Sequence, residues 1–375
     1  MKIIVKIGIF FLNIVFSIFK LLPVQKKITY ISRQMNTTPL DFKMVIENIH
    51  SKDSTYKHVV LAKMLTGGMK GYISYSFHIF KQMYHIATSQ AVILDTYCIP
   101  ISILKQRKKL IIIQMWHALG AFKKFGYSIL DQPEGSSSKL AKLMRMHYNY
   151  TYVLSSSQYT VPFFAEAFHV PIDKVIIYPL PKTDLLCERH LKEAVVQKIY
   201  NYYPDLERTK KKIIVYAPTF RKIEDGLYKA IKDLLNCIDF DHYEFVLKKH
   251  PLTQFSINDP RIIEDQYLTS LEFFHIADYI ITDYSAVLFE ASLLKKPIYF
   301  YAFDYDTYMK KRSLYIDYYN QLPGPVYQNP KDIINAIQDN HVDYDKIEKF
   351  RKLMIAPCTK SYTDDFVDFL LDKLS

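Results

Sequence analysis

The sequence predicts an α/β fold of two Rossmann-like domains whose parallel sheets face a central cleft, preceded by a membrane-associated helix. Short β-branched runs alternate with helical patterns beyond residue 27. Continuous Val/Ile-rich strands between helices are typical of parallel sheets buried on both faces. A polar segment at 188–210 interrupts this alternation and indicates a domain boundary. We therefore expect a helix at 1–26 and domains at 27–187 and 188–375.

The amino terminus carries a strongly apolar stretch, residues 3–22. A helix there would place its polar residues on one stripe, formed by Lys2, Lys6, Asn13, Ser17 and Lys20. A basic stripe on an apolar helix is typical of a helix that lies in the headgroup plane of a membrane. A spanning or signal-anchor helix, which this length allows, and a buried core helix are the alternatives. A cleaved signal peptide is disfavoured because no small-x-small cleavage site follows.

The predicted elements alternate along both halves of the chain. In the first half we expect strands at 27–31, 58–63, 91–95, 109–114, 150–154 and 174–177, and helices at 40–49, 72–87 and 139–147. In the second half we expect strands at 211–216, 243–248, 261–263, 279–281 and 297–301, and helices at 227–236, 270–277 and 285–294. Open parallel sheets bind ligands beyond the carboxyl ends of their strands, so polar residues there are the candidates for a site.

The composition favours an acidic partner and excludes several classes of site. The 375 residues include 49 Lys and Arg against 38 Asp and Glu, a net charge of +11, which suits nucleic acid, anionic lipid or a phosphorylated substrate. With 9 glycines and no G-x-G-x-x-G motif, a glycine-rich dinucleotide loop is not expected. The cysteines lack C-x-x-C spacing, which favours reduced, buried thiols over disulfides or a zinc site: Cys98, Cys187, Cys237 and Cys358.

His117 is the candidate general base. It follows the predicted strand at 109–114, next to Trp116, the only tryptophan of the chain. A histidine just past a strand end is placed to accept a proton near neutral pH. Taken alone, a histidine at such a place is more often structural, so its weight depends on the other strand ends.

Three strand ends of the second half carry residues suited to phosphate. Arg221 offers a planar fork of donors that matches phosphate oxygens. His250 directly precedes a proline that ends its strand. Ser285 opens a predicted helix whose first N–H groups suit a phosphate. A salt bridge, a turn and a helix cap are the structural alternatives, but together with His117 these residues suit a diphosphate held in the cleft, with a base opposite.

At these residues the sequence resembles the CDP-glycerol glycerophosphotransferase family, the teichoic acid primases and polymerases of Gram-positive bacteria. The resemblance covers nearly all of the chain after the amino-terminal helix. Its most specific segment is 277–290, which reads Ala-Asp-Tyr-Ile-Ile-Thr-Asp-Tyr-Ser-Ala-Val-Leu-Phe-Glu. The other similar segments are 31–34, Trp116-His117 with Lys123-Lys124, 216–221, Lys249-His250-Pro251, Lys296-Pro297-Ile298 and Tyr301.

The resemblance implies a GT-B architecture and peripheral attachment to the cytoplasmic face of the cell membrane, on anionic lipid. It implies transfer of glycerol phosphate from CDP-glycerol to a hydroxyl of an undecaprenyl-linked glycan or a growing teichoic acid chain, with release of CMP. A CDP-ribitol ribitolphosphotransferase is the nearest alternative. Many members read Trp-His-Gly-Thr where residues 116–119 read Trp-His-Ala-Leu, and residues 120–126 resemble a branch that includes ribitol-phosphate transferases. The alditol and the acceptor therefore stay open.

The resemblance also implies roles for individual residues. His117 would deprotonate the attacking hydroxyl, and the donor diphosphate would be held by Arg221, His250 and Ser285. Thr219 and Asp283 would shape that pocket, and Glu290 would reach the ribose hydroxyls. We expect cationic side chains to neutralise the diphosphate, so that no metal ion and no cofactor is required.

Two other functions fit part of the pattern. A nucleotide-sugar glycosyltransferase of the same fold would need a sugar-reading loop with carboxylates opposite the diphosphate. A non-catalytic, membrane-bound protein that binds polyanions or nucleic acid would explain the charge of +11 but not the polar motifs at four strand ends. We therefore expect no nucleic-acid partner.

Overall fold

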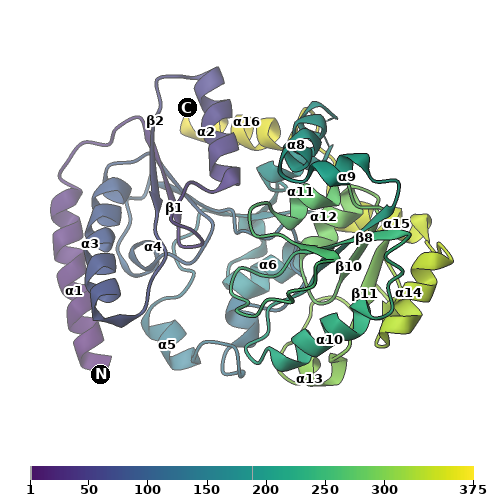
Figure 1. The fold of residues 1–375 in the computed structure, drawn as a ribbon. Helices are drawn as coiled ribbons and strands as arrows, with labels where there is room; N and C mark the ends of the chain where they lie inside the picture. The colour runs from purple at the N-terminus through teal and green to yellow at the C-terminus, as the bar shows by residue number, and fades with distance from the viewer. Residues whose placement is uncertain (1, 188) are drawn as a thin grey trace. The chain divides into compact units, whose positions relative to one another are not determined.

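The computed structural model describes residues 2–187 and 189–375. Met1, in the expected helix at 1–26, and Glu188, the expected first residue of the second domain, lie outside the described residues. The chain forms two compact units, each with a six-stranded sheet whose neighbouring strands pair in parallel (Figure 1). Unit 1 comprises the chain up to Leu119, Phe125–Lys182 and Ala356–Ser375, and unit 2 comprises Gly120–Lys124 and Thr183–Ile355.

The sheet of unit 1 has the strand order β2-β1-β3-β4-β5-β6. Its strands are β1 (Lys27–Ser32), β2 (Lys57–Ala62), β3 (Ala91–Leu94), β4 (Ile111–Gln114), β5 (Tyr152–Ser155) and β6 (Val175–Ile177). The order reverses between β1 and β3, the kind of place where open α/β sheets bind ligands. Leu94 pairs with Ile31 on one side and Gln114 on the other, so β1, β3 and β4 end at one edge.

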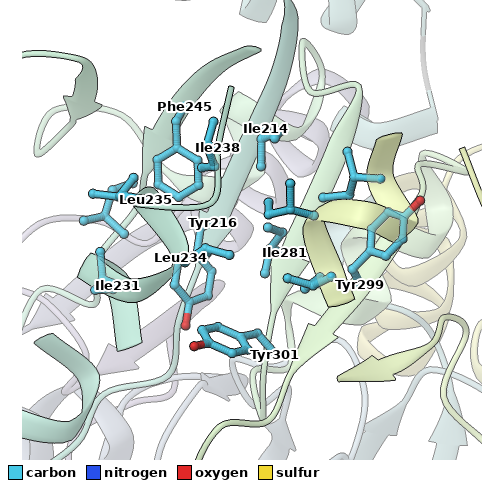
Figure 2. Packing of buried hydrophobic residues seen from close by; sticks show 14 of the residues in the cluster. Ile214, Tyr216, Ile231, Leu234, Leu235, Ile238, Phe245, Ile281, Tyr299 and Tyr301 are labelled. Atoms are coloured by element: carbon cyan, nitrogen blue, oxygen red, sulfur yellow. The ribbon is translucent and has the colours of Figure 1, made fainter. Parts of the chain in front are cut away.

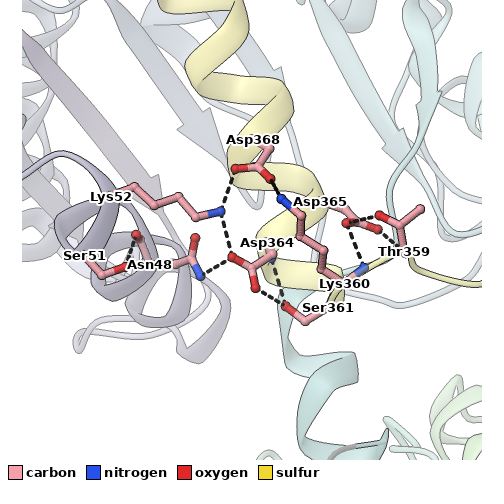
Figure 3. A network of polar contacts seen from close by, with 9 residues as sticks. All are labelled: Asn48, Ser51, Lys52, Thr359, Lys360, Ser361, Asp364, Asp365 and Asp368. Atoms are coloured by element: carbon pink, nitrogen blue, oxygen red, sulfur yellow. Dashed lines mark hydrogen bonds and ion pairs between the residues drawn. The ribbon is translucent and has the colours of Figure 1, made fainter.

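The helices of unit 1 come from both ends of the chain. They are α1 (Lys2–Phe19), α2 (Leu40–Lys52), α3 (Gly68–Ala87), α4 (Ile99–Ile103), α5 (Ser138–Leu143), α6 (Val161–Phe168) and α16 (Tyr362–Leu374), with the 3-10 turns η1 (Gly126–Ile129), η2 (Ile172–Lys174) and η3 (Pro181–Thr183). Lys52 on α2 pairs with Asp364 at 2.7 Å and Asp368 at 2.6 Å on α16 (Figure 3). Residues 356–375 thus pack in unit 1, although the sequence placed them in the second domain.

A short segment from the first half of the chain, Gly120–Lys124, belongs to unit 2. The Lys124 backbone N–H donates to the Ser313 carbonyl at 2.9 Å. A Cβ atom on Gly120 would come within 2.6 Å of the buried Phe289 ring, so glycine allows the backbone to approach this ring. The domain boundaries read from the sequence could not include this exchange, because it depends on pairing between segments almost 200 residues apart.

The sheet of unit 2 has the order β12-β11-β10-β7-β8-β9. Its strands are β7 (Lys212–Ala217), β8 (Tyr243–Leu247), β9 (Ile262–Glu264), β10 (Tyr279–Thr282), β11 (Ile298–Tyr301) and β12 (Val326–Tyr327). The order reverses between β7 and β10, whose last residues, Ala217 and Thr282, pair directly. Every strand expected from the sequence is present within two residues, and β12 is the additional one.

The helices of unit 2 bury an apolar core against this sheet. They are α7 (Asp184–Cys187), α8 (Arg189–Tyr202), α9 (Pro204–Arg208), α10 (Asp225–Leu235), α11 (Ser270–Phe274), α12 (Val287–Leu293), α13 (Tyr305–Met309), α14 (Pro330–Gln338) and α15 (Tyr344–Met354). Ile231, Leu234 and Leu235 of α10 cluster with Tyr216 and Phe245 of the strands (Figure 2). Burying side chains of this size stabilises the fold by about 1.5–3 kcal/mol each.

Helix α1 packs beside α3 (Figure 1). It leaves an apolar face exposed. That face consists of Ile3, Ile4, Ile7, Phe10, Phe11, Ile14 and Ile18. Two members of the polar stripe contact the protein instead of facing outward: the Asn13 side-chain oxygen accepts from the Lys105 N–H, and Lys20 Nζ donates to the Lys105 carbonyl, both at 2.9 Å. No helix within the described residues is both long and apolar enough to cross a bilayer.

The described cysteines form no disulfide. Cys98 is buried and Cys237 and Cys358 are half-buried, whereas Cys187 is exposed. The expectation that all four thiols are buried is therefore wrong for Cys187, which ends the short helix α7.

Candidate functional site

Arg221 lies at the reversal between β7 and β10 in unit 2, with its side chain 10% exposed. Its guanidinium donates to Asp304 at 2.8 and 3.1 Å, to Asp283 at 2.9 Å and to the Thr219 carbonyl at 2.8 Å. Burial opposes its charge, but Asp283 and Asp304 outweigh that effect and raise the pKa of Arg221 above its usual value. Four of the five N–H groups of an arginine are thus engaged within the protein.

Asp283 organises the same strand ends from a fully buried position. One carboxylate oxygen accepts from the backbone N–H groups of Thr219 at 2.8 Å and Tyr284 at 2.6 Å. The Thr219 hydroxyl is buried without a hydrogen-bond partner among the described residues. An unpartnered buried hydroxyl costs about 1–3 kcal/mol. A bound ligand could supply this missing partner.

Aromatic rings hold this arrangement in place. Tyr284 stacks on Tyr308 with ring centroids 3.8 Å apart and an interplanar angle of 12°. The Arg221 guanidinium lies 4.8 Å from the centre of the Tyr308 ring. The Tyr318 hydroxyl donates to the Asp283 carbonyl at 3.0 Å. These contacts help to position Arg221 and the loop after β7.

Ser285 and Glu290 differ in their access to a ligand. Helix α12 begins at Val287, two residues later than the sequence suggests, and the half-buried Ser285 hydroxyl accepts from the Val287 N–H at 3.5 Å. This bond is long, which leaves the hydroxyl able to bind elsewhere. Glu290 lies within α12 and is 7% exposed. Of these two, Ser285 is therefore the more accessible.

His250 follows β8 and is exposed. Its Nδ1 accepts from the Leu252 N–H at 3.2 Å, so the neutral ring carries its proton on Nε2 as a donor. Although the residue is exposed, desolvation by the surrounding protein atoms and the charge of Lys123 lower the pKa of His250. Lys123 belongs to the Gly120–Lys124 segment of unit 2 and was not among the predicted site residues. Its place in the Lys123-Lys124 motif was the available signal.

His117 follows β4 in unit 1, at the edge where β1 and β3 also end. Its Nδ1 lies 3.0 Å from the Asp95 carbonyl oxygen. A carbonyl only accepts, so this bond requires the proton on Nδ1 and leaves the Nε2 lone pair available as a base. The Gln34 amide nitrogen lies 3.1 Å from the same Nδ1 and donates to it only in the other tautomer. The two neighbours thus favour opposite tautomers.

The backbone before His117 is strained. Trp116 adopts a φ of 65°, in the left-handed region, and its N–H donates to the Gln114 side chain at 2.9 Å. Its ring stacks on Phe125 with centroids 4.6 Å apart and lies 4.1 Å from the His117 ring. Strain of this kind costs about 1–3 kcal/mol and is concentrated at functional sites.

Two charged residues near His117 were not predicted as part of the site. Lys182 Nζ donates to the His117 carbonyl at 3.2 Å. Although His117 keeps contact with solvent, desolvation by the surrounding protein atoms lowers its pKa. The hydrogen bond to the Asp95 carbonyl opposes this shift and the Lys182 charge adds to it, and the net lowering favours the neutral, basic ring at pH 7. Asp95 is buried, and burial raises its pKa to about 6. Polar residues at strand ends are candidates for a site, and Asp95 could have been found in this way because Asp95 ends the expected strand at 91–95.

The structure gathers the predicted residues into two groups. Hydrogen bonds connect Thr219, Arg221 and Asp283 in unit 2, where the His250 ring lies 5.6 Å from that of Phe220. His117 stands in unit 1. The described residues contain no group of three His, Cys, Asp or Glu side chains that could hold a metal ion. Asp304 begins one of three Asp-x-Asp triplets (239–241, 304–306 and 343–345), but Arg221 binds both of its carboxylate oxygens.

Known proteins are similar to this chain in sequence and in fold. A teichoic acid ribitol-phosphate primase of Bacillus spizizenii is 32% identical over 364 residues, which cover 93% of this chain and 92% of the relative. A teichoic acid glycerol-phosphate primase of Bacillus subtilis is 30% identical over 287 residues, which cover 73% and 71%. A solved variant of the wall teichoic acid polymerase TagF superposes with a TM-score of 0.75 at 20% identity, covering 100% of this chain and 97% of that one.

The sequence also matches a family model. The match extends over residues 14–364, which include most of both units and all of the candidate site residues. It is the model of the CDP-glycerol:poly(glycerophosphate) glycerophosphotransferases. The chain belongs to this family, among the teichoic acid primases and polymerases.

Proposed function

We propose that the chain transfers an alditol phosphate from a CDP-alditol to a hydroxyl of a lipid-linked glycan or teichoic acid chain. The acceptor oxygen bonds to the phosphorus that carries the alditol, the bond from that phosphorus to the bridging oxygen breaks, and CMP leaves. The acceptor proton passes to Nε2 of His117. The observation that carries this proposal is the 3.0 Å contact between His117 Nδ1 and the Asp95 carbonyl, which favours the tautomer whose Nε2 is the base.

The donor diphosphate is assigned to unit 2. His250 offers an Nε2–H donor, Ser285 a hydroxyl, and Lys123 a positive charge that lowers the pKa of His250. Arg221, whose donors are largely engaged by Asp283 and Asp304, acts by positioning the loop that carries Thr219. Preorganised donors of this kind contribute about 10²- to 10³-fold each to kcat.

CDP-glycerol is the donor expected from the sequence, and CDP-ribitol is the second candidate. The ribitol-phosphate primase of Bacillus spizizenii, which aligns over 93% of this chain, favours ribitol. A TagF structure soaked with CDPG favours glycerol, although that protein is only 20% identical. The test is CMP release from each donor with a lipid-linked disaccharide that carries no or one glycerol phosphate. CMP from neither donor, in detergent or in liposomes, would contradict the proposed reaction.

We also propose that the protein attaches peripherally to the cytoplasmic face of the cell membrane, where an undecaprenyl-linked acceptor would lie. Two neighbouring helices support this: Phe10 of α1 is 68% exposed and Phe77 of α3 is 74% exposed. The exposed Lys105, Lys108 and Lys109 add charge that anionic lipid attracts, worth about 1 kcal/mol each near the surface.

Vesicle sedimentation tests this attachment. Phe10→Glu and Phe77→Glu should reduce binding to phosphatidylglycerol vesicles, because each places a charge on the apolar face. Ile223→Glu is the matched control, since Ile223 is 75% exposed but lies in unit 2. Equal binding by all three variants would contradict the proposed surface.

A further inference from the structure

The sheet of unit 2 carries a cavity of about 380 Å³ at its amino-terminal edge, opposite to the edge of Arg221. Within the described part of the chain, its lining contains four lysines and a single acidic residue, Asp278, which leaves three positive charges in excess. The lysines come from separate elements, namely α8, the start of β7 and the turn between α12 and β11: Lys192, Lys212, Lys295 and Lys296.

Two of these lysines have no carboxylate partner among the residues that the structure describes. Lys296 is half-buried, and its Nζ donates to the Ala277 carbonyl at 2.6 Å. Lys192 is exposed on α8 and pairs with no acidic residue of the described chain. Burial and the Lys192 charge lower the pKa of Lys296, so the two ammonium groups repel each other. A bound anion would relieve this repulsion.

Each of the other two lysines forms an ion pair with one carboxylate. Lys212 pairs with Asp278 at 2.9 Å, and Lys295 pairs with Glu348 at 3.3 Å. Lys295 also adopts a φ of 52°, in the left-handed region that favours glycine. A lysine thus occupies a position where its backbone is strained, beside a cavity that it lines.

The positive charges of Lys192 and Lys296 also affect the pKa of a buried histidine. His275, next to the end of α11, is 4% exposed, and neither ring nitrogen has a hydrogen-bond partner among the described residues. Burial, followed by the charges of Lys192 and Lys296, lowers its pKa to about 4. His275 is therefore neutral at pH 7 and reports on the positive charge around it.

We propose that this cavity binds a phosphate-bearing anion. Lysine ammonium groups are compact charges that bind phosphate oxygens, and four lysines line this cavity. Tyr279 and Asn340, which also line the cavity, suit the hydroxyl groups of a small phosphate ester. The volume lies in the usual range of about 300–1,000 Å³ for small-ligand sites. Free phosphate and the phosphodiester of an alditol phosphate chain share this chemistry.

Calorimetry at constant ionic strength tests the site with inorganic phosphate, glycerol 3-phosphate and a bis-glycerol phosphodiester. Lys192→Gln should weaken binding about tenfold, as expected for the loss of one charged hydrogen bond. Lys229→Gln is the matched control, because Lys229 is 77% exposed on α10, outside the lining. Tighter binding of the esters would indicate the polymer as the source, and tighter binding of inorganic phosphate would indicate free phosphate.

Phosphate could also bind to the proposed donor residues, so a second variant separates the two sites. His250→Ala should leave binding in the lysine-lined cavity unchanged, and phosphate should raise the pKa of His275 in NMR titrations. The proposal is overturned if Lys192→Gln and Lys229→Gln bind all three probes alike, or if His250→Ala abolishes the binding.

Discussion

Arg221 at the strand ends of unit 2 and His117 at those of unit 1 differ in how fully the surrounding residues engage their side chains. In unit 2, Arg221 is enclosed by Asp283 and Asp304, which engage most of its donors. In unit 1, the His117 ring contacts a backbone carbonyl and an uncharged amide, and it remains exposed. A charged group with satisfied partners holds a loop in place, whereas a group with an available lone pair can react. The residue type alone does not distinguish these roles.

The largest expected effect is on activity in unit 1. His117→Gln should lower the rate of CMP release by about 10²- to 10⁴-fold, because it removes the general base. The free energy of unfolding should change little, since the His117 side chain is exposed. His50→Gln, at an exposed histidine of α2, is the control. Comparable activity in the two variants would rule out His117 as the base.

For Arg221, the main expected effect of a substitution is on stability. Arg221→Met leaves Asp283, which is fully buried, without its cation and should lower the free energy of unfolding by about 3–5 kcal/mol. Urea denaturation measures this change. Arg261→Met removes an ion pair from an arginine that is 50% exposed and should cost only about 0–1 kcal/mol. Equal urea midpoints for the two variants would mean that Arg221 is not a structural anchor.

A substitution at Gly120 tests the packing of the segment Gly120–Lys124, which places Lys123 in unit 2. Gly120→Ala brings a Cβ atom within 2.6 Å of the Phe289 ring and should destabilise the protein by about 1–3 kcal/mol. Gly226→Ala, on α10 with no atom within 4 Å of its Cβ, should instead stabilise it by about 0.5–1 kcal/mol. Thermal unfolding distinguishes these signs, and a neutral Gly120→Ala would contradict the packing of this segment.

The pH profile should show that His117 stays neutral. Its pKa is lowered, so the ring remains a base at pH values below the usual histidine pKa of about 6.5. CMP release should therefore persist below pH 6.5 and fall only at more acidic pH. An acidic limb at or above pH 6.5 would contradict the environment described for His117.

The smallest expected effect is the influence of Lys123 on the pKa of His250 in unit 2. Lys123→Gln should raise the pKa of His250, because a nearby positive charge is removed while burial remains. NMR titration of the histidine ring measures this shift. Lys222→Gln, in the same unit, is the control. An unchanged His250 pKa would place Lys123 too far away to share a phosphate with it.

The sequence by itself determined the elements and the edge of each sheet at which polar residues collect. Strands such as 27–31 and 243–248 were readable because buried parallel strands are continuously apolar and end at polar residues. His117 and Arg221 were selected because they follow strand ends, a rule that also covers Asp95, whereas Thr219 and Asp283 came from the family resemblance. The family resemblance, confirmed by the match over residues 14–364, added the class of reaction.

Only the tertiary structure decided which partners these side chains have. The pairing of Arg221 with Asp304 joins residues 83 positions apart, and the docking of α16 on α2 joins Lys52 to residues more than 300 positions away. The outward apolar face of α1 likewise depends on the loop at Lys105, which binds Asn13 and Lys20. Local periodicity records which residues are apolar, but the partner that buries or neutralises a residue is set by chain segments that meet only after folding.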